Sequence, residues 1–174
     1  MRDNDWRRRP GANAGGYRRW LIDRSSLTDR VRERCAAFRV ELVLQEPRRA
    51  TLDERFVAGR RERRALVREV FLSCGQERVV FAHSVTPLAN LRGAWHGLAG
   101  LGTRPLGAAL FADPRVRRPP LSFRKLGPRD EIHVRACAAT GRRLPALWAR
   151  RSLFMLGKSP ILVTEVFLPG ILDL

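Results

Sequence analysis

Short apolar or alternating segments recur along the chain and predict strands. Successive side chains of a strand point to opposite faces, so a strand with one buried face alternates and a strand with two buried faces is apolar throughout. Turn residues at 74–77 and 157–159 join two pairs of such segments into predicted hairpins. The predicted strands are residues 38–44, 65–73, 78–85, 121–126, 151–156 and 160–168.

Two segments predict helices that begin at identifiable residues. Ser26 is followed three positions later by an acidic residue, Asp29, and this capping-box pattern predicts a helix over residues 27–37. Pro105 suits the first position of a second helix, which continues through residues 108–111. The predicted hairpins outnumber strand-helix-strand alternations. The pattern therefore favours an α+β fold in which helices pack against a mostly antiparallel sheet.

The chain has the size and composition of one domain. Its 174 residues and hydrophobic fraction of 44% are typical of a domain with its own core. Residues 1–16 contain three consecutive arginines and a Gly/Ala/Asn stretch and predict a flexible basic tail, so the domain is expected to span residues 17–174. Residues 127–145 mix Pro, Gly and charge without a clear period and predict a variable excursion.

Positive charge dominates the composition. The 34 Lys and Arg outnumber 17 Asp and Glu, which gives a formal net charge of +17. Such a field attracts nucleic acid without sequence preference, and it attracts a small dianion equally. The arginines are dispersed, and no zinc-finger, RRM or KH signature and no interleaved aromatic residues accompany them. We therefore expect no specific nucleic-acid partner.

The sequence carries no sign of membrane insertion or secretion. No run approaches the roughly 20 apolar residues that span a bilayer, and no apolar segment follows the basic N-terminus. We therefore expect a cytoplasmic location. Cys35, Cys74 and Cys137 lack metal-binding spacing, and their odd number predicts reduced thiols in that compartment.

Two charged residues stand out within apolar strands. Both faces of the segment 160–168 are apolar apart from Glu165, and burial of a lone carboxylate raises its pKa unless a partner compensates. Arg68 lies on an apolar stripe of the segment 65–73. Buried charges are retained when they pair with each other or contact a ligand. An Arg68–Glu165 ion pair and a ligand site are thus both open, and Glu69 also interrupts an apolar face.

Two helix starts add to the ligand hypothesis. Leu27 and Leu106 lie in the first turns of the predicted helices, where unpaired backbone N–H groups favour an anion. Ordinary capped helix ends are the alternative. Together with a buried arginine and a buried carboxylate, these N–H groups predict a site for an aromatic or cyclohexadienyl acid.

Several strings of the sequence resemble the chorismate pyruvate-lyase family from about Trp20 onwards. The strings are residues 66–72 (LVREVFL), 103–107 (TRPLG) with 110–111 (LF), 150–152 (RRS) and 163–169 (VTEVFLP). The resemblance implies a largely antiparallel six-stranded sheet with helices at its side and an enclosed site under flap-like segments. It also implies that the substrate is chorismate, which is split without a cofactor or metal into 4-hydroxybenzoate and pyruvate. This reaction is the first step of ubiquinone biosynthesis, and the resemblance implies a monomer.

The resemblance also assigns candidate site residues. The family's arginine for the ring carboxylate matches Arg68, and its carboxylate at the reacting end matches Glu165, which would transfer a proton or orient the substrate. Two backbone contacts match Leu106 and Leu27. The chain departs from its relatives in a longer segment 112–149. It also has His83-Ser84 where relatives commonly carry an arginine and a hydroxyl residue, and we expect His83 to be a packed or partly exposed strand residue rather than a catalyst.

Two other classes of function remain open. A similar fold serves as the effector domain of some bacterial transcription regulators, so a non-catalytic sensor of small aromatic acids is the main alternative. Such regulators carry a separate DNA-binding domain, for which the residues before Trp20 leave no room. A basic nucleic-acid-binding protein is the third possibility, and it predicts salt-dependent duplex binding without chorismate turnover.

Overall fold

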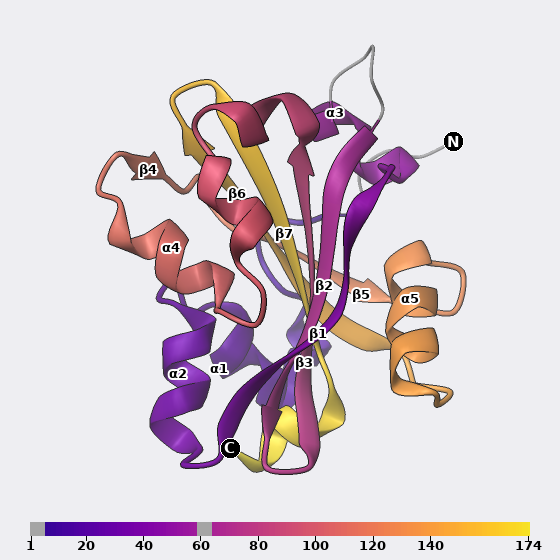
Figure 1. Cartoon of the computed structure of the whole chain (residues 1–174). Helices are drawn as coiled ribbons and strands as arrows, with labels where there is room; N and C mark the ends of the chain where they lie inside the picture. The colour runs from indigo at the N-terminus through magenta and orange to yellow at the C-terminus, as the bar shows by residue number, and fades with distance from the viewer. Residues whose placement is uncertain (1–5, 59–63) are drawn as a thin grey trace.

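The strands form one antiparallel sheet in the computed structural model, which describes residues 6–58 and 64–174 (Figure 1). The strand order is β1-β2-β3-β7-β6-β4, and β5 also pairs with β6. Every pairing is antiparallel, which confirms the predicted α+β class. The strands are β1 Phe38–Arg49, β2 Arg64–Cys74, β3 Glu77–Pro87, β4 Val116–Arg117, β5 Ser122–Leu126, β6 Leu147–Leu156 and β7 Ser159–Phe167.

The two predicted hairpins are present and lie side by side in the sheet. β2 and β3 form the first, β6 and β7 form the second, and β3 pairs with β7 between them. Gly75 and Gly157 occupy the two turns with φ of 57° and 59°, a conformation that glycine adopts without steric cost. The described residues contain seven strands where the resemblance implies six, and one of the seven is the two-residue β4.

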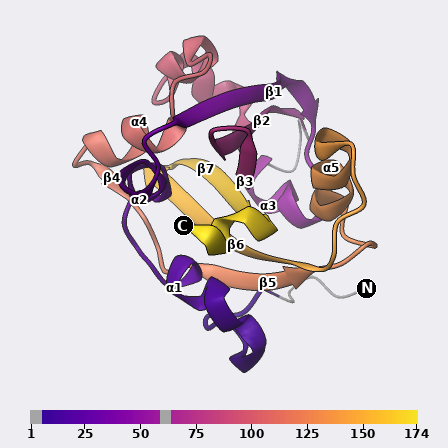
Figure 2. The ribbon, with the colours of Figure 1, turned by 90° about the horizontal axis from the view of Figure 1, so that it is seen from below.

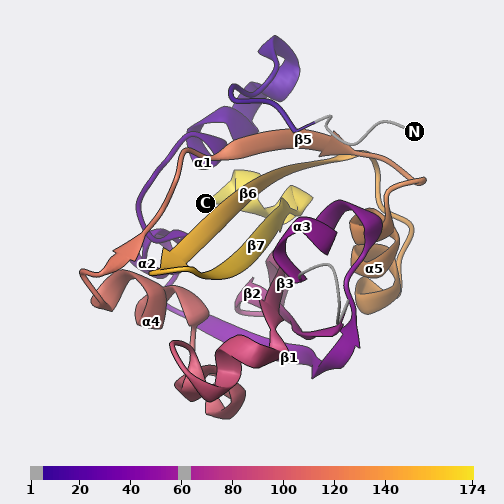
Figure 3. The same cartoon turned by 90° about the horizontal axis from the view of Figure 1, so that it is seen from above.

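Helices cover both faces of the sheet. The α-helices are α1 Arg18–Leu21, α2 Leu27–Arg34, α3 Arg55–Ala58, α4 Leu106–Ala112 and α5 Glu131–Thr140. Short 3-10 segments lie at Ala12–Tyr17, Leu52–Glu54, Leu88–Arg92, His96–Gly100 and Pro169–Asp173. Helices α2 and α4 lie on one side of the sheet and α5 lies on the other (Figures 2 and 3). Within the described ranges, none of these helices is long and apolar enough to traverse a membrane.

Helix α2 begins where the capping pattern predicts. The Ser26 hydroxyl accepts a hydrogen bond from the Asp29 N–H at 3.3 Å, which satisfies one of the free donors of the first turn. The helix buries Leu27, Thr28 and Val31 against the sheet side. It ends at Arg34, before the predicted end at residue 37, and the chain enters β1 at Phe38.

The segment 127–145 contains a helix that its pattern did not predict. α5 buries Ile132, His133 and Ala136, and its last turn is closed by Gly141 with φ of 69°. Its apolar positions are too few and too small to mark a stripe in the sequence. Because most helix stability in proteins comes from tertiary packing, the sheet face stabilises a helix that the local pattern does not indicate.

Residues 6–16 pack against the domain, whereas the sequence predicts a loose tail over residues 1–16, of which residues 1–5 lie outside the described residues. Arg7 pairs with Phe123 of β5 through two backbone hydrogen bonds of 2.9 and 2.8 Å. The indole N–H of Trp6 donates to Asp53 at 3.0 Å, and Ala14 is buried. Single apolar residues among many arginines thus anchor this segment, and composition alone does not reveal them.

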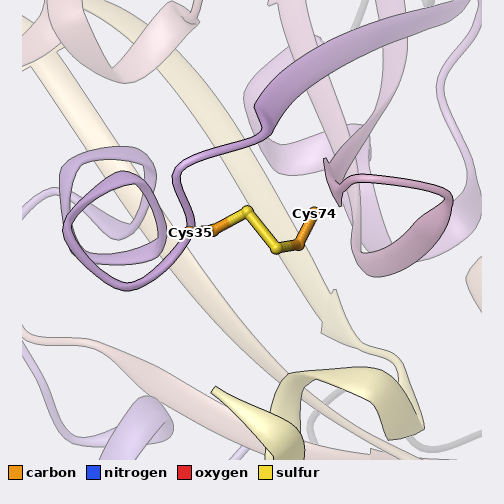
Figure 4. The surroundings of a disulfide bond; sticks show 2 residues. All are labelled: Cys35 and Cys74. Carbon is orange, nitrogen blue, oxygen red and sulfur yellow. A yellow bond between two sulfur atoms is a disulfide. The ribbon is translucent and has the colours of Figure 1, made fainter.

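Cys35 and Cys74 form a disulfide, which corrects the prediction of three reduced thiols (Figure 4). Cys35 follows α2 and Cys74 ends β2, 39 residues later. The two cysteines meet because Phe38, at the start of β1, is the antiparallel partner of Cys74. Their spacing in the sequence contains no trace of this pairing. Cys137 is a half-buried free cysteine.

Candidate active site

One cavity lies between the sheet and helices α2 and α4. Side chains from β2, β3 and β7 form its floor. The cavity brings together all four residues that the sequence singles out: Leu27, Arg68, Leu106 and Glu165. Arg68 lies on β2 and Glu165 on β7, two strands away in the sheet. Val163 is the residue of β7 in line with Arg68, and Glu165 lies two residues further along that strand. Their Cα atoms are therefore roughly 12 Å apart, and both side chains face the same cavity.

Arg68 is a buried cation with no carboxylate partner among the described residues. It is 6% exposed, and its Nη2 donates to the carbonyl oxygens of Gly102 and Arg104 at 3.0 Å each. Its Nε is buried without a hydrogen-bond partner. Burial lowers the pKa of Arg68 to about 10, which leaves the guanidinium charged at neutral pH. The site thus contains an unneutralised positive charge held by the loop before α4.

Glu165 pairs with Arg150 on the neighbouring strand β6. Arg150 Nε donates to one carboxylate oxygen, and its Nη2 lies 3.4 Å from the other. Arg150 is completely buried and also donates to the carbonyl oxygens of Trp20 and Asp23. The Arg68–Glu165 ion pair considered from the sequence is not formed. Glu165 is a paired carboxylate instead of the isolated one that the strand pattern suggests, and its counterion was missed because pairing across strands is a tertiary property.

The first turns of α2 and α4 meet at the edge of the cavity. Leu27 and Leu106 are the first residues of the two helices. Gly107 lies so close to the partner helix that a Cβ atom there would be 3.4 Å from the hydroxyl oxygens of Ser26 and Thr28. Leu27 and Leu106 both line the cavity, so the first turns of the two helices, whose free N–H groups favour an anion, lie at its edge.

Arg118 also lines the cavity, although no sequence pattern singled it out. It follows β4 directly and lies in the segment 112–149, which is longer than in the relatives that the sequence resembles. Its Nη2 donates to the Ser152 hydroxyl at 2.7 Å, and its Nη1 donates to the Arg24 carbonyl at 2.6 Å. Burial lowers the pKa of Arg118 to about 10, so this guanidinium also stays charged at neutral pH.

His83 and Glu69 face away from the cavity, on the other side of the sheet. His83 Nδ1 lies 3.0 Å from Glu69 Oε1, and its Nε2 lies 2.9 Å from Glu54 Oε1. Arg135 of α5 donates to Glu69 at 3.1 Å. His83 is 1% exposed, so of the two kinds of strand residue expected from the sequence, packed or partly exposed, it is the packed one. Strand alternation therefore separates Arg68 from Glu69, although both interrupt an apolar sequence.

Opposing effects set the charge state of this cluster. Burial would lower the pKa of His83, but hydrogen bonds and charge from Glu54 and Glu69 outweigh it and raise the pKa. Burial would raise the pKa of Glu54, but His83 and Thr51 outweigh it and lower that pKa to about 2. The cluster is thus an imidazolium between two carboxylates. It lies on the face of the sheet opposite the cavity, where its role is structural.

The fold and the cavity define a class of protein: a single antiparallel α+β domain that encloses a small site lined by arginines and helix N-termini. The chorismate lyase family matches residues 12–173. The chain belongs to this family, and it is a lyase. No cluster of three or more His, Cys, Asp or Glu side chains suited to a metal ion occurs in the described part of the chain.

Sequence relatives match the chain over nearly its whole length. A protein of Nitrosomonas europaea named "Probable chorismate pyruvate-lyase" is 52% identical over 153 residues, which cover 87% of this chain and 86% of that protein. A protein of Nitrosospira multiformis with the same name is 47% identical, and the match covers 98% of this chain and 96% of the relative.

Solved structures share the fold at low sequence identity. The C-terminal domain of the histidine utilization repressor from Pseudomonas syringae pv. tomato has a TM-score of 0.55 and 11% identity, and covers 76% of this chain and 92% of that domain. The effector domain of PhnF from Mycobacterium smegmatis has a TM-score of 0.52 and 15% identity, with coverage of 84% and 90%. At such identities the likeness shows a common fold alone.

Proposed function

We propose that the chain is a chorismate pyruvate-lyase that converts chorismate into 4-hydroxybenzoate and pyruvate. The observation that carries the proposal is the cavity in which Arg68, without a carboxylate partner among the described residues, and Glu165 face the same space. The names of the relatives support the same substrate. A ring acid placed between these two side chains would supply the anion that Arg68 lacks.

Arg68 would hold the ring carboxylate. Its buried Nε has no partner in the described residues, and a carboxylate accepts two parallel hydrogen bonds from a guanidinium. The backbone N–H groups of Leu27 and Leu106 would add donors from the two helix starts. The site therefore orients the ring by one end.

The reaction needs orientation more than activation. The C3–O bond of chorismate breaks, the C4 hydrogen leaves as a proton, and the ring becomes aromatic. Enolpyruvate departs with the bonding electrons and takes up a proton to become pyruvate, so atoms and charge balance. Because aromatisation supplies a large driving force, fixed geometry contributes much of the rate. Glu165, in the next row of side chains from Arg68, would transfer a proton at the reacting end or orient that end.

The cellular role follows from the product. 4-Hydroxybenzoate is the aromatic precursor formed in the first step of ubiquinone biosynthesis, and we propose that the chain performs this step in the cytoplasm as a monomer. The proposal requires no cofactor, because the side chains named above supply the binding and proton-transfer groups.

A direct assay tests the proposal against its alternatives. Purified protein is mixed with chorismate, without added metal, and 4-hydroxybenzoate is followed by its ultraviolet absorbance. We expect product formation at a rate proportional to protein concentration. Tight binding of aromatic acids without turnover would instead support a sensor domain, the main alternative considered from the sequence. Duplex binding without turnover would support a nucleic-acid-binding protein.

A further inference from the structure

The cavity contains a second guanidinium that the proposed function has not used. Arg118 lies between β4 and β5 and lines the same cavity as Arg68. We propose that Arg118 binds the second carboxylate of the substrate, on the side chain that leaves, while Arg68 binds the carboxylate on the ring. This inference rests on the proposed function, because it assigns the second charged group of that substrate.

Strand register places the two guanidiniums at opposite ends of the cavity floor. One row of paired residues crosses four strands: Arg68 on β2, Ser84 on β3, Val163 on β7 and Ser152 on β6. Three strand spacings separate the ends of the row, roughly 14 Å along the sheet. Arg118 is attached to the far end, since its Nη2 and Nε donate to Ser152 Oγ at 2.7 and 3.2 Å. Two cations thus approach one space from opposite ends.

Glu165 lies between these cations in the next row. It pairs with Ala82 on β3 and with Arg150 on β6, so its carboxylate belongs to the middle of the floor. A ligand that places one carboxylate at Arg68 and the other at Arg118 holds the intervening ring and ether oxygen over this position. The arrangement matches an acid with two separated negative charges and a reacting bond between them.

Arg118 is available to an anion because its contacts are neutral. Its Nη1 donates to the Arg24 carbonyl at 2.6 Å, and its guanidinium lies 5.2 and 5.1 Å from the ring centroids of Phe111 and Phe154. Among the described residues it has no carboxylate partner in direct contact. A half-buried cation held by neutral oxygens and aromatic rings gains a charge-assisted contact from a bound carboxylate without breaking an ion pair.

The other candidate cations of this region are already engaged. Arg150 is bound to Glu165, and Arg151 reaches the opposite side of the sheet, where its Nη2 lies 2.7 Å from Asp53. The side chain of His83 is also on that opposite side. Arg118 therefore remains as the second cation of the cavity within the described part of the chain.

The experiment compares a matched pair of stable ring acids. 3-(Carboxymethoxy)benzoate carries two carboxylates, 3-methoxybenzoate carries one, and binding of each is measured by isothermal titration calorimetry. We expect the wild type to bind the diacid about ten- to a hundredfold more tightly, as a charge-assisted hydrogen bond implies. In Arg118→Gln this preference should disappear, while the affinity for the monoacid should stay within about twofold.

Controls separate a lost contact from a disturbed fold. Arg117→Gln changes the exposed neighbour and should keep the preference for the diacid. Arg68→Gln should weaken the binding of both acids. Arg118→Met also removes the charge but preserves packing on Phe111 and Phe154. If the glutamine variant does not fold, the methionine variant tests whether the preference for the diacid depends on Arg118. The inference would be overturned if a folded Arg118 variant kept the preference for the diacid, or if it bound both acids more weakly by the same factor.

Turnover distinguishes this inference from the proposed function. With chorismate, Arg118→Gln should raise KM about tenfold or more and change kcat less, because binding of the second carboxylate is lost. If the wild type prefers the diacid through Arg118 but does not turn over chorismate, the lyase proposal fails and the inference stands. If it turns over chorismate and the preference does not depend on Arg118, the inference fails alone.

Discussion

Three arginines near the cavity show how the partners of a residue define its role. Arg150 is buried and bound to Glu165, so its charge is compensated within the protein. Arg68 and Arg118 contact carbonyl and hydroxyl oxygens instead. A buried charge without a counterion is unfavourable unless a ligand supplies one. Residue type alone does not distinguish these three, whereas their partners do.

Replacement of Glu165 tests its role in the chemistry. Glu165→Gln keeps the size of the side chain but removes the proton-transfer group, so kcat for chorismate should fall by about 100-fold or more if Glu165 transfers a proton. Steady-state kinetics measures this, and binding of 4-hydroxybenzoate checks that the cavity is intact. Glu46→Gln, on the exposed part of β1, is a matched control that should keep full activity. Full activity in Glu165→Gln would eliminate proton transfer by this residue.

On the face of the sheet opposite the cavity, a cluster of charged side chains connects several strands and helices. His83 on β3 contacts Glu69 on β2 and Glu54 before α3, and Arg135 of α5 reaches Glu69. The cluster thereby connects two strands and two helices on the face opposite the cavity. Removal of one side chain of the cluster leaves the other charges buried and uncompensated. Such a substitution should therefore destabilise the packing of all four elements together.

The pH dependence of stability should report this cluster. The pKa of His83 is raised in the folded state, so its contribution is complete below about pH 6.5, the usual value for histidine, and is lost as pH rises through the raised folded value. Urea unfolding at several pH values should show His83→Gln destabilised by about 3–5 kcal/mol at pH 6. The difference from wild type should shrink at higher pH.

A matched histidine provides the control for this prediction. His96 is exposed, lies 3.1 Å from the Gly93 carbonyl and is outside the cluster, so His96→Gln should leave the free energy of unfolding close to that of wild type. A constant difference between wild type and His83→Gln across this pH range would show that the imidazole is not protonated in the folded protein.

At the scale of the whole molecule, the disulfide connects the end of α2 to the end of β2 (Figure 4). Closing a loop of 39 residues restricts the unfolded chain, which in the chain-entropy model stabilises the folded state by about 4 kcal/mol. Urea unfolding with and without dithiothreitol should show this difference. Cys137→Ser should keep the sensitivity to reductant, and Cys35→Ser should lack it. Equal stability of oxidised and reduced wild type would contradict the prediction.

Much of the architecture followed from local pattern. The hairpin turns at Gly75 and Gly157 and the start of α2 at Ser26 lie where the sequence predicts them. Turn residues and capping residues act over a few positions, so they can be recognised in the sequence. α5 and the packed segment 6–16 were not predicted, because both are stabilised mainly by contacts with distant strands.

The sequence by itself determined the class of fold, the family and the two charges on strands, Arg68 and Glu165, because alternation and short motifs are local properties. Only the tertiary structure decided that Glu165 pairs with Arg150, that Glu69 faces away from the cavity and that Arg118 enters it. The physical reason is that partners are chosen by register across strands and by loops that fold back over the sheet. Neither leaves a mark on the spacing of residues along the chain.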